Sequence, residues 1–173
     1  MPLDVMKNDR TYSGTVSYTG TINVPAGTID NADVNAGAAI AATKLEHQFP
    51  ISKGLVAPGV AVTAMTKLLH IVAGATGEIV SIEAAVTTIA TGADRSLSVD
   101  LQKSTAGGAF ATVLSATADI DDEDTVRTAY AGTVSSASLV DGDILELIVT
   151  VAGSAANQAE GLIVTVQLRE DPA

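Results

Sequence analysis

Carboxylates are the side chains of this sequence that offer the most chemistry. The densest cluster is the acidic run DIDDED, from Asp119 to Asp124. Clustered carboxylate oxygens are the ligands that Ca²⁺ prefers, so a cation site is one interpretation. The run does not fit an EF-hand loop, because its sixth position, Asp124, is not glycine and its twelfth, Tyr130, is not glutamate. A charge run usually forms a solvated surface, so a turn between two strands is favoured.

A second acidic pair lies in the segment LVDGDILEL, where Asp141 and Asp143 flank Gly142. Two close carboxylates could act as an acid and a base, or bind a cation. The Asp-Gly dipeptide is also an ordinary turn signal in front of a strand. We therefore predict a turn at this position.

Nucleophilic and metal-based catalysis find few suitable residues. The two histidines, His47 and His70, do not have metal-type spacing, and no G-x-S-x-G turn is present. The glycines fall between expected strands, which excludes a phosphate-binding loop. We expect His70 to be a packed or sheet-facing residue. We also expect no catalytic residue, no cofactor and no metal centre, although a hydrolase using the acidic run remains a minor alternative.

The charge is distributed unevenly along the chain. Of 173 residues, 20 are acidic and 9 are Lys or Arg, and the net charge is −11. Residues 1–54 hold five acids and four bases, so almost the whole negative charge belongs to residues 55–173. An acidic surface argues against nucleic acid and against anionic membranes as partners. With no apolar signal-peptide core and no run of about 18 apolar residues, we expect synthesis in a cytoplasm.

Residues 55–173 are predicted to form an all-β, antiparallel β-sandwich. Apolar and polar residues alternate with a period of two in several segments, and glycine- and aspartate-rich turns separate them. About seven or eight strands are expected, which suits a jelly-roll-like or an immunoglobulin-like sandwich. The expected strands lie in the segments 60–72, 80–89, 96–101, 110–117, 126–134, 144–151 and 162–169. Val80 and Ile82 are expected on one face of their strand, and Ile89 is out of phase with them, which suggests a bulge or a strand end. Leu97, Val99 and Leu101 are likewise expected on one face.

Residues 1–54 are predicted to form an N-terminal arm and docking segment. Residues 11–24 are rich in Thr, Tyr and Val and suggest an extended arm. Val34, Ala38, Ala41 and Leu45 recur at helical spacing. We therefore expect one short helix that covers residues 38–47 and ends before Pro50. Because a helix this short is marginal in water, it must dock on another surface.

Three passages resemble small virion structural proteins of tailed bacteriophages. These passages are AGAAIAATKLEHQF, SLVDGDILELIVTV and AEGLIVTVQLREDP, which together hold 42 of the 173 residues. The resemblance implies a capsid decoration (cement) protein or head fibre, often a homotrimer, seated on the lattice of the major capsid protein. It also implies a location on the capsid surface after synthesis in the host cytoplasm.

Our sequence-based hypothesis is a structural protein that binds the outer surface of a phage capsid and stabilises it. The residues expected at the capsid or subunit interface are Val16, Tyr18, Val34, Ile40 and Leu45. Deletion of residues 1–50 is expected to leave the sandwich folded and to abolish binding to shells. The alternative is a head or tail fibre, or a receptor-binding protein that contacts the host surface.

Overall fold

The computed structural model describes residues 47–74, 76–92, 96–153 and 157–171, all within one of the chain's two units, Ala41–Ala173. These residues form strands, turns and loops, and none of them forms a helix that could cross a membrane. The strands are β1 (His47–Gly54), β2 (Met65–Ile71), β3 (Thr76–Thr88), β4 (Ser96–Ser104), β5 (Ala111–Thr112), β6 (Leu114–Ala116), β7 (Ala118–Asp121), β8 (Tyr130–Val134), β9 (Ser138–Leu139), β10 (Ile144–Val151) and β11 (Glu160–Asp171).

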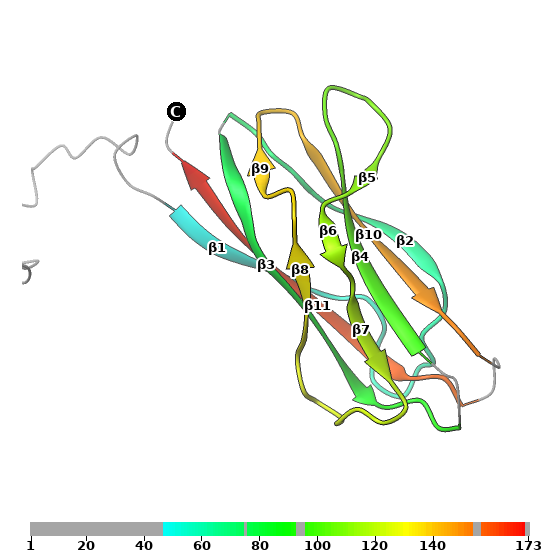
Figure 1. The fold of residues 1–173 in the computed structure, drawn as a ribbon. Coiled ribbons are helices and arrows are strands. Elements are labelled where there is room, and N and C mark those ends of the chain that lie inside the picture. Colours follow the sequence, from blue (N-terminus) through cyan, green and yellow to red (C-terminus); the bar gives the residue numbers. More distant parts are fainter. Residues whose placement is uncertain (1–46, 75, 93–95, 154–156, 172–173) are drawn as a thin grey trace, which may run out of the picture. The chain divides into compact units, whose positions relative to one another are not determined.

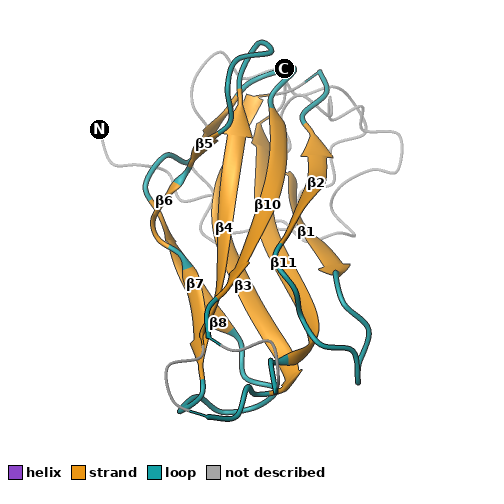
Figure 2. Cartoon of the chain, turned by 90° about the vertical axis from the view of Figure 1, so that its right-hand side faces the viewer, coloured by secondary structure: helices purple, strands orange, loops and turns teal. Residues whose placement is uncertain are grey.

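The strands form two sheets in which the paired strands are antiparallel (Figure 1). One sheet has the order β1-β11-β3-β8-β6, with β9 paired to β3. The other has the order β2-β10-β4-β5, with β7 paired to β4. Figure 2 shows the longest strands running side by side, with the described loops gathered at their two ends. The expected all-β architecture with two antiparallel sheets is confirmed.

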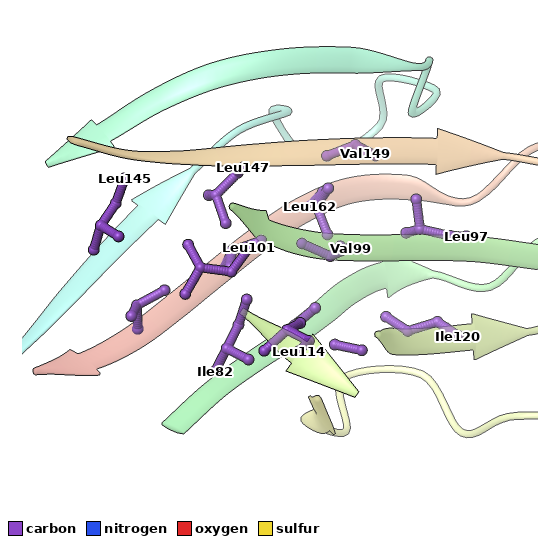
Figure 3. Packing of buried hydrophobic residues seen from close by; sticks show 14 of the residues in the cluster. Ile82, Leu97, Val99, Leu101, Leu114, Ile120, Leu145, Leu147, Val149 and Leu162 are labelled. Atoms are coloured by element: carbon purple, nitrogen blue, oxygen red, sulfur yellow. The ribbon is translucent and has the colours of Figure 1, made fainter. Parts of the chain in front are cut away.

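Alternation along the strands explains how the core forms between the sheets. In β4, the side chains of Leu97, Val99 and Leu101 are buried, while the residues between them are partly exposed. Strand β11 buries Leu162, Val164, Val166 and Leu168 in the same way. Residues from both sheets meet in one hydrophobic cluster, and Figure 3 shows Leu101, Leu147 and Leu162 lying close together within it. The period-two pattern therefore assigned the inner faces of these strands correctly.

The buried hydrophobic residues of the described part are all aliphatic. Phe49 and Tyr130 pack against this cluster but are only partly buried. Aliphatic side chains bury less area each than the 150–250 Å² typical of aromatic ones, so close packing of many small groups must stabilise the core.

Strand β1 corrects the sequence-based prediction for residues 47–50. His47 was expected at the end of a helix, but it begins β1, which pairs with β11 in register from His47–Glu170 to Gly54–Ile163. Pro50 lies within this strand and does not terminate a helix. Proline has no N–H to donate, which an edge strand tolerates because one of its sides has no partner strand. Residues 47–54 thus belong to the sheet, and the rest of the expected helix lies outside the described residues.

Strand β3 contains an irregularity at Val80, where the period-two pattern assigned the wrong face. Val80, expected on the same face as Ile82, is 42% exposed, whereas its neighbour Ile79 is buried. The pairing with β11 shifts at this point, from Ser81–Gln167 to Ile79–Leu168. The extra residue forms a β-bulge that turns Val80 outward. Ile89, which the pattern placed at a bulge or strand end, follows the last residue of β3.

Candidate functional site

Among the described residues, a pocket of about 420 Å³ lies on the outer side of the six-stranded sheet. We call it the sheet-face pocket. It is lined by residues from β1, β3, β11 and two loops, among them Gly54, Pro58, Ala85, Arg127, Gly161 and Ile163.

Strand register builds the floor of this pocket. Ile163 of β11 lies between Gly54 of β1 and Ala85 of β3, with which it is paired directly. Ile163 is 48% exposed, although its neighbours Leu162 and Val164 are buried. A side chain flanked by Gly and Ala leaves a depression on either side, so the floor is both apolar and hollow.

The loop that follows β1 forms one wall and is fixed by backbone hydrogen bonds. The N–H of Leu55 donates to the carbonyl of Leu162 at 2.8 Å, and the N–H of Gly161 donates to Val60 at 3.1 Å. Gly161 has φ of +63°, and a Cβ there would clash with Thr87 Oγ1 and lie 3.0 Å from Pro58 Cα. Only glycine combines that backbone conformation with so close an approach of the loop.

Arg127 contributes the charge of the pocket. It lies in the loop between β7 and β8, and its N–H donates to the carbonyl of Val86 at 3.0 Å. Its φ of 59° is in the left-handed region, which costs a non-glycine residue about 1–2 kcal/mol. Among the residues that the structure describes, no carboxylate forms an ion pair with its guanidinium.

Exposed apolar side chains form a second feature on the outer face of the five-stranded sheet. Leu68 and Ile71 of β2 are 62% and 60% exposed. Ile71 pairs with Ile144 of β10, and Ile148 lies on the same face of that strand. Glu146 lies between these two isoleucines, pairs with Leu68 and is largely buried. We call Leu68, Ile71, Ile144 and Ile148 the β2–β10 patch. Lys53 Nζ, from the other sheet, donates to the backbone carbonyl of Leu68 at 3.4 Å.

The acidic run has a structural role in the described chain. Asp119 lies in β7 and accepts hydrogen bonds from Ser98 and Thr117, both at 2.6 Å. Asp121 Oδ1 accepts the N–H of Glu123, and Asp124 Oδ2 accepts the N–H of Asp121. Because these bonds close a loop between β7 and β8, the predicted turn is confirmed. No group of three or more Asp, Glu or His in the described part could hold a metal ion.

The Asp141–Asp143 turn is also confirmed, and it is more deeply anchored. Asp141 Oδ1 accepts the N–H of Gly74 at 2.7 Å, which ties the turn to the loop between β2 and β3. Asp143 is fully buried, and its Oδ2 accepts the N–H of Val140 at 3.0 Å. The same oxygen lies 3.6 Å from Lys103 Nζ, which also donates to the carbonyl of Ser138 at 2.7 Å.

His70 is a packed residue, as the sequence predicted. Its ring meets that of Phe49 edge-to-face at 6.1 Å, and its Nε2 lies 3.7 Å from Glu170 Oε1. These contacts join β2 of one sheet to β1 and β11 of the other. His70 therefore links the two sheets along one side of the sandwich.

The predicted interface residues lie outside the described part of the chain, so their contacts stay predictions. They are Val16, Tyr18, Val34, Ile40 and Leu45. Sequence reasoning missed both the sheet-face pocket and the β2–β10 patch. For the patch a signal existed, because Ile144 and Ile148 make the second face of their strand apolar. The pocket gave no such signal, because its floor depends on the register of three strands.

Comparison with known proteins found no matching family model and no matching curated protein. Among solved structures, one similar chain comes from the structure of infectious bursal disease virus Gt strain, with 15% sequence identity and a TM-score of 0.33. The match covers 89% of this chain and 42% of the viral chain.

Proposed function

We propose that this chain is a structural protein of a bacteriophage particle, which binds the outer surface of the capsid and stabilises it. In this proposal its partners are the major capsid protein and further copies of itself, with a trimer favoured. It acts on the capsid surface after synthesis in the host cytoplasm. It works by binding alone, without a catalytic step, a cofactor, nucleic acid or a membrane.

The exposed apolar side chains of the β2–β10 patch carry the proposal. Large exposed apolar side chains that gather on one face commonly mark an interaction site. Here they surround the largely buried Glu146, which pairs with Leu68. The patch lies on paired strands, so its side chains are held in place before a partner arrives. Docking therefore costs little conformational entropy. Leu68 and Ile71 are each about three-fifths exposed. On docking, these two side chains would have the most apolar area removed from water.

The strand order supports a jelly roll as the finer description of the sandwich. The strands β1, β3, β8 and β11 lie in one sheet, and β2, β4, β7 and β10 in the other. From β1 to β4 the chain thus changes sheets at every step. An immunoglobulin-like sandwich keeps its first two strands in the same sheet. Jelly rolls occur in viral capsid proteins, but also in lectins and cupins. The fold therefore does not identify the function, which has to be argued from the residues on the surface.

The test is co-sedimentation of the purified protein with empty shells of the major capsid protein from the same virus. We expect saturable binding and a higher temperature for shell disruption, because many copies on a lattice gain strength by multivalency. Leu68→Asp combined with Ile71→Asp should weaken binding at least tenfold, since burying an unpaired carboxylate is costly. The matched control is Val80→Asp, an apolar-to-acid change on the other sheet, which should bind like the wild type.

Two results would overturn the proposal. One is the absence of wild-type binding to shells, and the other is full binding by the double variant. Binding to host cells without any capsid would instead favour the receptor-binding alternative. The mass of the protein in solution, measured by light scattering, tests the trimer separately.

A further inference from the structure

The sheet-face pocket has the size and lining of a site for one apolar group. Its volume of about 420 Å³ lies within the 300–1,000 Å³ typical of ligand sites. Besides the pocket-floor residue Ile163, the lining includes the apolar residues Val56, Pro58 and Ala85. An apolar lining favours an occupant that is itself apolar at its tip.

The pocket is formed before any occupant arrives. Both sides of its floor are paired strands, and its loop wall is fixed through the backbone bonds of Leu55 and Gly161. A Cβ built on Gly54 would meet no atom within 4 Å, so the glycine leaves open space where a side chain would stand. Docking would therefore require little rearrangement of the protein.

Arg127 determines the charge of the preferred occupant. It is a cation without an ion-pair partner among the described residues, in a chain whose net charge is −11. A guanidinium binds a carboxylate through two parallel hydrogen bonds. A nucleic acid would offer many phosphates, whereas the lining of the pocket contains a single charged residue, Arg127, which matches one anionic group. A protein surface that presents one carboxylate is the better match.

From this complementarity we infer that the sheet-face pocket holds an apolar side chain that stands beside a carboxylate on the surface of the capsid protein. The apolar side chain fills the hollow over Gly54, Ile163 and Ala85, and the carboxylate pairs with Arg127. The inference rests on the proposed function and adds to it a second docking point, with the chemistry of its partner.

The chemistry of the pocket can be tested without shells, with octanoate as the probe and octan-1-ol as the uncharged control. In a ¹H–¹⁵N NMR titration, octanoate should cause saturable shifts at the amides of Ala85, Thr87 and Ile163. Octan-1-ol should bind at least fivefold more weakly, because it lacks the charge-assisted hydrogen bonds. Absence of octanoate shifts at these amides would overturn the inference.

Two variants separate the shape of the pocket from its charge. Gly54→Leu places a side chain in the hollow, where its Cβ meets no atom within 4 Å, and should abolish the octanoate shifts. Arg127→Gly removes the charge at a φ that glycine adopts without strain, and should weaken octanoate about tenfold while the protein stays folded. Lys67→Ala removes an exposed cation from β2 and should leave octanoate binding unchanged. Equal binding by the wild type and Gly54→Leu would contradict the inference.

Shell binding then distinguishes this inference from the proposed function. If both hold, wild-type protein binds shells and the Gly54→Leu and Arg127→Gly variants bind at least tenfold more weakly. If the variants bind shells as tightly as the wild type, the pocket inference is overturned and the proposed function stands. If octanoate binds in the pocket but the wild type does not bind shells, the proposed function fails, and with it the capsid protein as occupant.

Discussion

The Asp119–Asp124 loop and the Asp141–Asp143 turn are both rich in aspartate but have different roles in the structure. Figure 1 shows them at opposite ends of the strands, after β7 and before β10. In the first, carboxylates bond with one another's backbone at the surface. In the second, the Asp143 carboxylate is buried and faces Lys103, which is 19% exposed. Acidic composition alone therefore does not tell how much a turn contributes to the stability of the fold. The burial of its carboxylates is the better guide.

The strongest challenge to this comparison is Lys103→Met, for which we expect the largest loss of stability. The variant leaves the Asp143 carboxylate buried with only the Val140 N–H as partner. Breaking a buried ion pair in this way costs about 3–5 kcal/mol. Chemical denaturation measures the free energy of unfolding, with Lys67→Met as the control for an exposed lysine. A loss no larger than that of the control would show that the burial of Asp143 does not matter.

The next effect is that of Asp143→Ala, which we expect to cost about 2–3 kcal/mol. The Val140 N–H loses its acceptor, which leaves a part-buried donor unpaired. Lys103 is the less buried partner of the ion pair and keeps its bond to the Ser138 carbonyl. Leaving its charge without the Asp143 carboxylate therefore costs less stability than leaving the Asp143 charge without Lys103. The double variant Lys103→Met with Asp143→Ala should therefore be more stable than Lys103→Met alone. Simple additivity of the two losses would contradict this coupling.

Asp119→Ala should have an intermediate effect, a loss of about 1 kcal/mol. It removes the acceptor of two hydroxyl hydrogen bonds, from Ser98 and Thr117, at a position open to water. Both hydroxyls can then bond to water, which limits the loss. The thermal midpoint of unfolding measures it, and a loss as large as that of Asp143→Ala would erase the distinction between the two turns.

The smallest effect is expected for Asp122→Ala, whose stability should stay within about 0.5 kcal/mol of the wild type. Its neighbours Asp121 and Asp124 provide the hydrogen bonds that close the loop. Millimolar Ca²⁺ should leave the melting temperature unchanged, because a cation bound to the native state would raise it. A calcium-dependent rise that Asp122→Ala removes would restore the cation-site interpretation.

The sequence predicted the strands well where alternation was regular. Leu97, Val99 and Leu101 of β4, and the matching residues of β10 and β11, were assigned to the correct faces because a strand has a fixed period of two. The assignment failed at Val80, because a bulge adds one residue that no local pattern announces.

Other features depend on partners that are distant in the chain. At His47 the apparent helical pattern was overridden by pairing with β11, more than a hundred residues later. Likewise, the sheet-face pocket requires Gly54, Ala85 and Ile163 to meet in register. Single-sequence reasoning had no means of aligning these three positions.

The pairing of β1 with β11 also determines where a deletion that tests the N-terminal segment should end. Removal of residues 1–46 keeps all of β1, whereas removal of 1–50 takes half of this strand together with Phe49, which contacts His70. We expect the shorter deletion to melt like the full chain and the longer one to melt at a lower temperature. Equal melting temperatures would mean that the first half of β1 adds nothing to stability.

Pro50 and Lys53 affect how readily the edge strands of neighbouring copies can pair when the copies are crowded together. Pro50 removes one donor from the free edge of β1, and the ammonium of Lys53 occupies the Leu68 carbonyl of β2. Exposed strand edges are templates for cross-β polymerisation, and proline and lysine are common means of blocking it. Copies held side by side at high density could thus remain discrete, because neighbouring edges on this flank cannot readily continue one another's sheets.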